Sequence, residues 1–405
     1  MISFEKAEKI YQGSIKVLKK VQLKNGGCIA TPEDERYPYV YPRDHAMITR
    51  AFISAGLYNR AKKALDFVFS TKTDKNAFPQ RIDTNGEDAS YKPVQIDGTG
   101  LTLYTFCNYI EETADYDFGL KYFSRARKAA DYIIDSFYEN VEGKYEKRKH
   151  NLKMPLVYTP NSIHEYPPTE KGLEIWANCT CCAGLNSLSE ISKRIGQVNK
   201  KYRSYAKKIH KGILNHMWNP RLNSFIKTIR VRESSSVLLD PDVGEYGIAE
   251  FGLLKDDDKR VVSTVSNIEK NLWNKDLGGI CRYPKYEGRN NGGWGPWPNY
   301  TLMLCRHYIR RGNQDKADKY LKWVLDISYD NLLPEHVSTV DEFEEYVSDF
   351  KRAGLIREDR EKMIENARSH PMFDEGIAYI TLPLAWSHAE FIMTFNLYKK
   401  RFDGD

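Results

Sequence analysis

The strongest constraint on the fold is the recurrence of apolar residues at helical spacing along nearly the whole chain of 405 residues. About a dozen such segments follow one another in pairs, and the only clear strand pattern is a short hairpin at 218–229. Short turns join the helices of a pair, and longer loops separate the pairs. Antiparallel helical pairs can close into a ring, in which inner helices are apolar all round and outer helices are amphipathic. The sequence therefore predicts an all-α toroid with its long loops gathered at one mouth, where they can line a pocket.

No linker or low-complexity segment divides the chain, so we expect a single domain over residues 1–405. Residues 338–370 stand apart because they are highly charged, yet Phe343, Val347 and Phe350 recur at helical spacing. This pattern predicts an inserted helical pair between a loop at residue 335 and the last long helix. The insertion is either a solvated decoration or an element that covers the pocket or mediates homo-oligomer formation.

Composition and charge argue against several classes of function. The net charge is +6, with acidic residues interleaved among the basic ones, so nucleic acid is not an expected partner. No apolar run is long enough to cross a membrane, and the polar N-terminus has no signal-peptide pattern. Seven cysteines without paired spacing favour a reducing, cytoplasmic location.

No metal site or cofactor is predicted from the sequence. Cys179, Cys181 and Cys182 lie close together, but Cys-x-Cys-Cys without a second cluster is a poor zinc pattern. Buried thiols on a helix are the better interpretation of these three residues.

Glu335 is the first candidate for a catalytic group. It lies in the stretch Leu-Leu-Pro-Glu-His-Val at 332–337, where a proline favours a loop over a helix. A loop carboxylate held by rigid helices is a common way to present a catalytic group. A solvated surface glutamate is the alternative.

A second candidate site lies at 39–44, where Arg43 and Asp44 adjoin aromatic residues at the start of a helix. Both charges could serve as a helix cap and salt bridge. They could instead hold sugar hydroxyls, with Tyr41 packed on the ring. Asp97, which also precedes a helix, is expected to be an N-cap.

Glu174 ends a long loop and lies two residues before Trp176, which we expect to contact the substrate. Apolar cover would raise the pKa of such a carboxyl, as a general acid near neutral pH requires. Glu165 and Glu170, in the same loop, are alternatives for this role.

A loop rich in glycine and proline carries Arg282, Trp294 and Trp297, and we expect the two tryptophans to be exposed platforms. Two acids, an arginine–aspartate pair, a further arginine and several tryptophans are the composition of a glycosidase pocket. Two carboxyls suffice for that chemistry, because one protonates the leaving oxygen and the other activates water.

These motifs, in this order, resemble those of glycoside hydrolase family 15, the group of glucoamylases, glucodextranases and trehalases. The resemblance covers nearly the whole chain. It is carried by Tyr-Pro-Arg-Asp at 41–44, Gln95-x-Asp97-x-x-Gly100, Asp-Pro-Asp-Val at 240–243, the stretch 251–260, Arg-Tyr-Pro at 282–284, Gly-Pro-Trp at 295–297, Leu-Pro-Glu at 333–335 and Pro-Leu-Ala-Trp-Ser-His at 383–388.

The resemblance implies an (α/α)6 barrel and an inverting, exo-acting release of β-glucose from α-glucosides. It implies that Glu335 is the general base and that Arg43 and Asp44 grip the terminal glucose. Tyr41 then stands where the family usually has Trp, and Arg282 binds the sugar near the scissile bond.

The chain departs from the family pattern at two catalytic positions. The family's general acid directly follows a tryptophan, whereas Ala177 follows Trp176 here, and Glu174 fits the acid position only with a shift of two residues. The residue after the base is His336 instead of Gln. We therefore expect a cytoplasmic hydrolase of short gluco-oligosaccharides. A catalytically inactive sugar-binding or regulatory protein, and a glycosidase for another sugar such as trehalose, are the alternatives.

Overall fold

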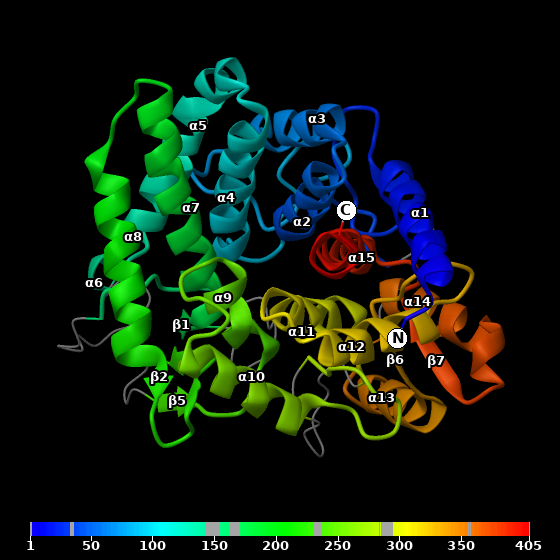
Figure 1. Cartoon of the computed structure of the whole chain (residues 1–405). Helices are drawn as coiled ribbons and strands as arrows, with labels where there is room; N and C mark the ends of the chain where they lie inside the picture. The colour runs from blue at the N-terminus through cyan, green and yellow to red at the C-terminus, as the bar shows by residue number, and fades with distance from the viewer. Residues whose placement is uncertain are drawn as a thin grey trace.

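The computed structural model describes residues 2–32, 36–141, 154–161, 171–230, 236–282, 284, 295–354, 356 and 358–404. Within these residues, helices form two concentric rings, seen nearly end-on in Figure 1. The inner ring closes because each helix packs against the next, and the last packs against the first. Its members are α2 (Pro42–Ser54), α4 (Ile96–Thr113), α7 (Ile175–Arg194), α9 (Gly247–Glu250), α11 (Pro298–Arg310) and α15 (Ala385–Tyr398).

The outer helices pack against the outside of the inner ring; most pack against an inner neighbour in the chain, whereas α1 packs against α15 at the other end of the chain. They are α1 (Phe4–Val21), α3 (Tyr58–Phe69), α5 (Tyr116–Asp135), α8 (Lys200–Gly212), α10 (Lys259–Leu272) and α12 (Gln314–Asp326). Outer helices bury one face only, whereas most residues of α4, α7, α11 and α15 are buried. This contrast is the one predicted for an (α/α)6 barrel.

One inner helix is much shorter than the sequence indicates. The apolar spacing over 243–254 predicts a helix, but the segment forms a 3-10 turn, η2 (Val243–Tyr246), followed by the four residues of α9. Gly244 and Gly247 lie directly against the side chain of Trp176, and Gly252 ends the segment in the left-handed conformation with φ of +71°. Each glycine weakens a helix by about 1 kcal/mol relative to alanine. Gly244 and Gly247 are kept here because larger side chains would crowd Trp176, and the helix is short as a result.

Short strands lie in the long connections between the helices. One sheet has the order β1 (Leu173–Glu174), β4 (Thr228–Arg230) and β5 (Ser236–Leu238), and β2 (Trp218–Asn219) pairs with β3 (Ser224–Phe225). The second pair is the hairpin predicted at 218–229. The remaining turns and short helices are α6 (Tyr138–Val141), η1 (Ile213–Met217), η3 (Pro371–Phe373) and η4 (Lys399–Asp403).

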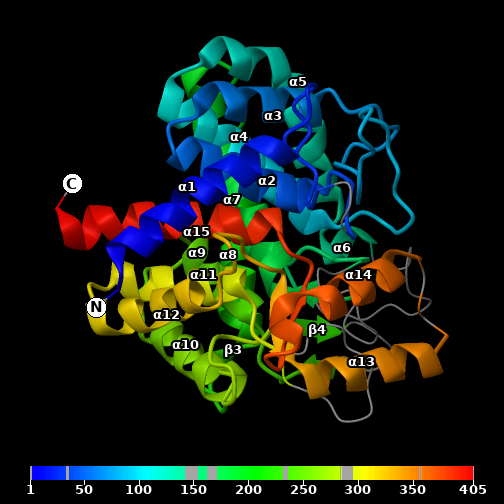
Figure 2. The ribbon, with the colours of Figure 1, turned by 90° about the vertical axis from the view of Figure 1, so that its right-hand side faces the viewer.

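The segment expected to be an inserted helical pair contains α13 (Val340–Arg352) and α14 (Glu358–Ser369), which lie beside the barrel in Figure 2. Two strands, which the sequence pattern did not indicate, flank the pair: β6 (His336–Thr339) and β7 (Ile377–Ile380). They are antiparallel, with His336 opposite Ile380. The insertion has its own apolar core, in which Phe343, Phe350 and Met363 are buried.

Two glycines let α4 and α7 approach closely. A Cβ added to Gly184 would lie 2.5 Å from the carbonyl oxygen of Gly100, and one added to Gly100 would lie 2.6 Å from the backbone nitrogen of Cys181. Real side chains do not tolerate such distances to backbone atoms. The spacing of these two inner helices therefore depends on the absence of side chains at both positions.

We predict that Gly184→Ala lowers the free energy of unfolding by about 1–3 kcal/mol, because overpacking against a backbone atom outweighs a gain in helix propensity of at most about 1 kcal/mol. Urea denaturation followed by circular dichroism measures this change. Asn186→Ala, at an exposed position of the same helix, is the control and should stay within about 0.5 kcal/mol of wild type. Equal stability of Gly184→Ala and wild type would contradict the close-approach argument.

Candidate active site

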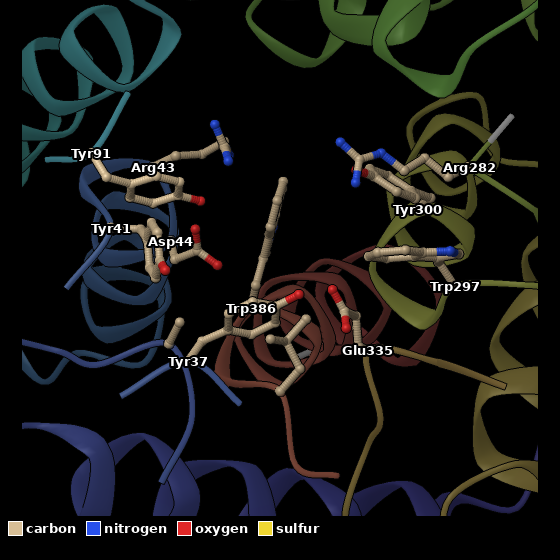
Figure 3. A pocket seen from close by; sticks show the side chains of 12 residues that line it. Tyr37, Tyr41, Arg43, Asp44, Tyr91, Arg282, Trp297, Tyr300, Glu335 and Trp386 are labelled. Atoms are coloured by element: carbon tan, nitrogen blue, oxygen red, sulfur yellow. The ribbon is translucent and has the colours of Figure 1, made fainter. Parts of the chain in front are cut away.

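A cavity of about 640 Å³, counting the space open to solvent, lies at one mouth of the barrel. Polar and aromatic side chains surround it, as Figure 3 shows. The lining residues are Ala30, Tyr37, Tyr41, Arg43, Asp44, Tyr91, Arg282, Trp297, Tyr300, Glu335, Leu384 and Trp386.

The first turns of the inner helices supply much of this lining. Arg43 and Asp44 belong to the first turn of α2, Tyr300 to that of α11 and Trp386 to that of α15. Unpaired N–H groups and the helix dipole make helix N-termini favourable places for carboxylates and oxygen-rich ligands. The cavity therefore lies where several positive helix ends converge.

Arg43 is held on one side of the cavity by the start of α4. Its Nη1 donates to Gln95 Oε1 and to Asp97 Oδ2, both at 3.1 Å. Asp97 was expected to cap α4, but Gln95 occupies the N-cap position and Asp97 lies in the first turn, paired with Arg43. The cap expectation was wrong because an aspartate with a buried arginine partner gains more from the ion pair than from a cap.

Glu335 lies across the cavity from Arg43 and Asp44 (Figure 3). Glu335 is only 8% exposed, so the alternative of a solvated surface glutamate is excluded. Its backbone N–H donates to the carbonyl oxygens of Ile380 and Thr381, and the Thr381 hydroxyl donates to Oε2 at 3.1 Å. Thr381 adopts φ of +54°, a conformation that is rare for a β-branched residue. Backbone strain of this kind clusters at functional sites.

The start of α15 fixes the loop that carries Glu335. Ser387 Oγ donates to the carbonyl of Pro334 at 2.7 Å, and the Leu333 N–H donates to His388 Nε2 at 3.1 Å. Because an amide N–H can only donate, His388 carries its proton on Nδ1, which donates to Ser14 Oγ at 2.8 Å. Burial lowers the pKa of His388 to about 3, so the ring is neutral under ordinary conditions.

An aromatic wall closes another side of the cavity. Trp297 stacks on His336 with ring centroids 4.8 Å apart, and the Arg282 guanidinium lies 5.4 Å from the Trp297 ring. Trp297 is only 4% exposed, so the expectation of an exposed platform was wrong. Gly295, two residues earlier, has φ of +90° and lies directly against Val337. A Cβ at position 295 would overlap the Val337 carbonyl oxygen, so the loop that carries Trp297 packs tightly on β6.

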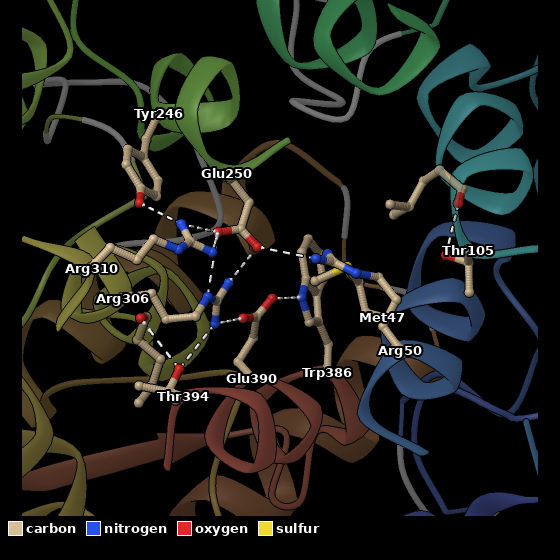
Figure 4. A network of polar contacts seen from close by, with 12 residues as sticks. Met47, Arg50, Thr105, Tyr246, Glu250, Arg306, Arg310, Trp386, Glu390 and Thr394 are labelled. Atoms are coloured by element: carbon tan, nitrogen blue, oxygen red, sulfur yellow. Dashed lines mark hydrogen bonds and ion pairs between the residues drawn. The ribbon is translucent and has the colours of Figure 1, made fainter. Parts of the chain in front are cut away.

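Trp386 forms the floor of the cavity and is bonded to a charge network inside the barrel (Figure 4). Its Nε1 donates to Glu390 Oε1 at 2.8 Å, and Glu390 also accepts from Arg306. Burial raises the pKa of Glu390. For Glu250, Arg306 and its neighbouring arginines outweigh burial and lower the pKa to about 2. The floor is therefore positioned by ion pairs deeper in the barrel.

Glu174 and Trp176 are not among the described residues that line the cavity. Glu174 is 1% exposed at the junction of β1 and α7. Trp176 packs inside against Phe251, with ring centroids 5.0 Å apart, which is a core position and does not fit a role in contacting substrate. Glu165, Glu170 and Trp294 lie outside the described residues.

In the part of the chain that the structure describes, no three His, Cys, Asp or Glu side chains form a group that could hold a metal ion. Cys179, Cys181 and Cys182 are buried thiols on α7, as the sequence indicated. None of the described helices is both long enough and apolar enough to cross a bilayer.

Sequence reasoning missed several residues of the cavity. Tyr37, Tyr91, Tyr300 and Trp386 line it but were not named as site residues. Tyr300 and Trp386 could have been predicted from the sequence, because each lies in the first turn of a helix that is apolar all round. Tyr37 and Tyr91 lie in loops, where local sequence gives no direction.

Comparisons with solved structures decide the fold. A wild-type glycosidase superposes with a TM-score of 0.69 over 98% of this chain and 99% of its own, at 16% identity. The glucoamylase from Saccharomycopsis fibuligera gives 0.68 over 97% and 95%, at 13% identity. The chain has the (α/α)6 fold of the glucoamylases. This confirms the predicted fold class.

Sequence comparison adds a weaker relationship. Trehalase 2 of Sulfolobus acidocaldarius is 23% identical over 388 residues, which cover 85% of this chain. The chain spans about 62% of the length of that protein. No family model matches the chain.

We predict that His388 makes stability depend on pH. Its pKa is lowered on folding, so the unfolded chain binds more protons below the ordinary pKa of 6.5. The stabilisation is therefore complete above pH 6.5 and declines as pH falls toward 3, by up to about 1.4 kcal/mol per pH unit. His388→Gln should reduce this slope, to which the buried His45 and His336 also contribute, measured as the unfolding free energy in urea between roughly pH 4.5 and 7.

The control is His216→Gln, since the His216 side chain is exposed. This variant should keep the wild-type slope, whatever its absolute stability. Identical slopes for His388→Gln and wild type would show that His388 is not the titrating group.

Proposed function

We propose that the chain is an exo-acting, inverting glycoside hydrolase that releases β-glucose from short α-gluco-oligosaccharides. The observation that carries the proposal is the placement of Glu335 opposite Arg43 and Asp44 in one cavity. A buried carboxylate and an arginine–aspartate pair from distant parts of the chain meet there, with aromatic rings around them. Glycoside hydrolysis uses two carboxyl groups that flank the scissile bond, and we assign Glu335 as one of them.

In the proposed mechanism, Arg43 and Asp44 bind hydroxyls of the terminal glucose, and Trp386 closes the floor beneath it. Glu335 accepts a proton from a water molecule, which attacks the anomeric carbon. Glu174 donates a proton to the glycosidic oxygen as the C–O bond breaks. The product is inverted because water enters from the face opposite the leaving group.

The floor of the cavity supports an exo mode of action. Leu384, the N-cap of α15, and Trp386, in its first turn, both line the cavity, and we propose that they stop a sugar chain from continuing inward. An enzyme with such a site takes only the end of a chain. The closed floor therefore favours small or terminal glucosides over internal bonds.

Glu174 is proposed as the acid because it is a buried carboxyl at the N-cap of α7, an inner helix, although no described residue of α7 lines the cavity. Its burial fits a carboxyl whose neutral, proton-donating form is favoured. Glu165 and Glu170 are its rivals.

Glu335→Gln should reduce kcat on maltose by about 10²–10⁴-fold, the usual contribution of a positioned general base. Proton NMR of the first turnover products of the wild type should show β-glucose, which then mutarotates. Glu269→Gln is the matched control, since Glu269 lies on the outer helix α10 and bonds to Tyr320. Initial release of α-glucose, or full activity of Glu335→Gln, would contradict the proposal.

Trehalose is a second candidate substrate, favoured by the likeness to a trehalase. A panel of maltose, isomaltose and trehalose separates the two candidates by kcat/KM. We expect maltose or isomaltose to be cleaved. Cleavage of trehalose alone would replace the first proposal with the second, and oligosaccharide binding without any hydrolysis would favour a regulatory protein.

A further inference from the structure

We propose that Arg36 is a positioning residue for Glu335 and that the helix pair α13–α14 holds it in place. This inference rests on the proposed function, in which Glu335 is the general base. It gives the inserted helices a role in the active site. Neither Arg36 nor the insertion is marked by the sequence motifs of the site.

The first observation is the contact between the two charges. Arg36 Nη1 lies 4.0 Å from Glu335 Oε2, and the two side chains are only 12% and 11% exposed. At this burial the attraction is screened far less than it would be on the surface. The Thr381 hydroxyl donates to the same oxygen. Arg36 and Thr381 together therefore fix one carboxylate oxygen of Glu335.

The second observation is that α14 anchors Arg36. Its Nη1 lies 3.4 Å from the sulfur of Met363, which is 1% exposed on α14. The guanidinium also lies 4.8 Å from the centroid of the Tyr37 ring, and Tyr37 lines the cavity. Arg36 is thus held between the insertion and the wall of the cavity.

The third observation links the insertion to Glu335 through the backbone. Ile380 packs in the apolar core of α13 and α14, and its carbonyl accepts the Glu335 N–H at 3.1 Å. The insertion therefore contacts the catalytic loop from two directions, by β7 and by Arg36. These two contacts argue against the alternative in which the insertion is only a solvated surface segment.

Two other titratable side chains near Glu335 carry no charge. His336 follows it in the chain, but burial, together with Arg36 and Arg282, lowers the pKa of His336 to about 3, so this ring carries no charge. Burial raises the pKa of Tyr37 well above its ordinary value, so the phenol is neutral too. The remaining charged residues of the cavity lining are Arg43, Asp44 and Arg282.

Arg43 is engaged with Asp97, and Arg282 lies over Trp297. The ion pair with Arg36 favours the ionised form of Glu335 from the side of the insertion. A general base must be ionised to accept a proton from water. We infer that Arg36 extends the activity toward acidic pH and holds the carboxylate in position.

The experiment compares Arg36→Met, Arg36→Lys and Met363→Ala with wild type. Removing the charge in Arg36→Met should move the acidic limb of the kcat/KM profile upward by roughly one pH unit, because an opposite charge within about 4–6 Å favours a carboxylate. Arg36→Lys should recover part of the shift. Met363→Ala should shift the limb in the same direction by less, whereas Met363→Leu, which keeps the packing, should not.

Arg125→Met is the matched control. Arg125 packs over the Phe78 ring at 4.3 Å and donates to the Ala77 carbonyl, away from Glu335. Its loss should lower stability without moving the acidic limb. If Arg36→Met reduces the rate equally at every pH, Arg36 has only a structural role and the proposal is wrong. If Met363→Ala leaves the limb unchanged, the part assigned to α14 is wrong.

A measurement without turnover separates this inference from the proposed function. Carbon-13 NMR of glutamate labelled at Cδ, with Glu335 assigned through Glu335→Gln, follows the carboxyl titration directly. A higher titration midpoint in Arg36→Met supports the ion pair even if no glucoside is cleaved. An unchanged midpoint overturns it even if the enzyme is an active glucosidase.

Discussion

The packing of α15 between α2 and α11 is the contact on which the site depends. It closes the inner ring by joining the last long helix to one of the first. Arg43 and Asp44, near the start of the chain, thereby face Glu335 and Trp386 across one cavity. A ring left open at this point would place the two halves of the site on separate surfaces.

Charged side chains are buried inside the ring of apolar helices, and they are stabilised there by pairing with opposite charges. Arg306 binds both Glu250 and Glu390, and Arg310 and Arg50 complete the pairing with Glu250. Arg306, Glu250 and Glu390 are buried, and each has an oppositely charged partner, which is the condition under which buried ions are tolerated. Since Glu390 also accepts from Trp386, the same network orients the floor of the cavity.

Much of the fold was predictable because its signal is local. Helical spacing, with some helices apolar all round and others amphipathic, indicated the two rings. The short η2–α9 segment was not predicted, because contact with Trp176 decides it. Strands β6 and β7 were missed for a similar reason, since each is four residues long and has meaning only beside the other.

The candidate site was partly predictable. Tyr41, Arg43, Asp44, Arg282, Trp297 and Glu335 were named from residue type and position at helix ends, and all of them line the cavity. Trp176 was misplaced, because a tryptophan at a helix start can face the core as readily as the mouth. Arg36 gave no signal, since its neighbours in space are Glu335 and Met363, both about 300 positions away in the chain.

The sequence alone determined the class of fold and the kinds of side chain available to the site, because periodicity and residue chemistry are properties of short segments. Only the tertiary structure decided which of those side chains meet. That choice depends on ring closure, on the close approach of α4 and α7 at two glycines, and on the docking of the insertion beside Glu335. These are contacts between residues far apart in the chain, and no local pattern encodes them.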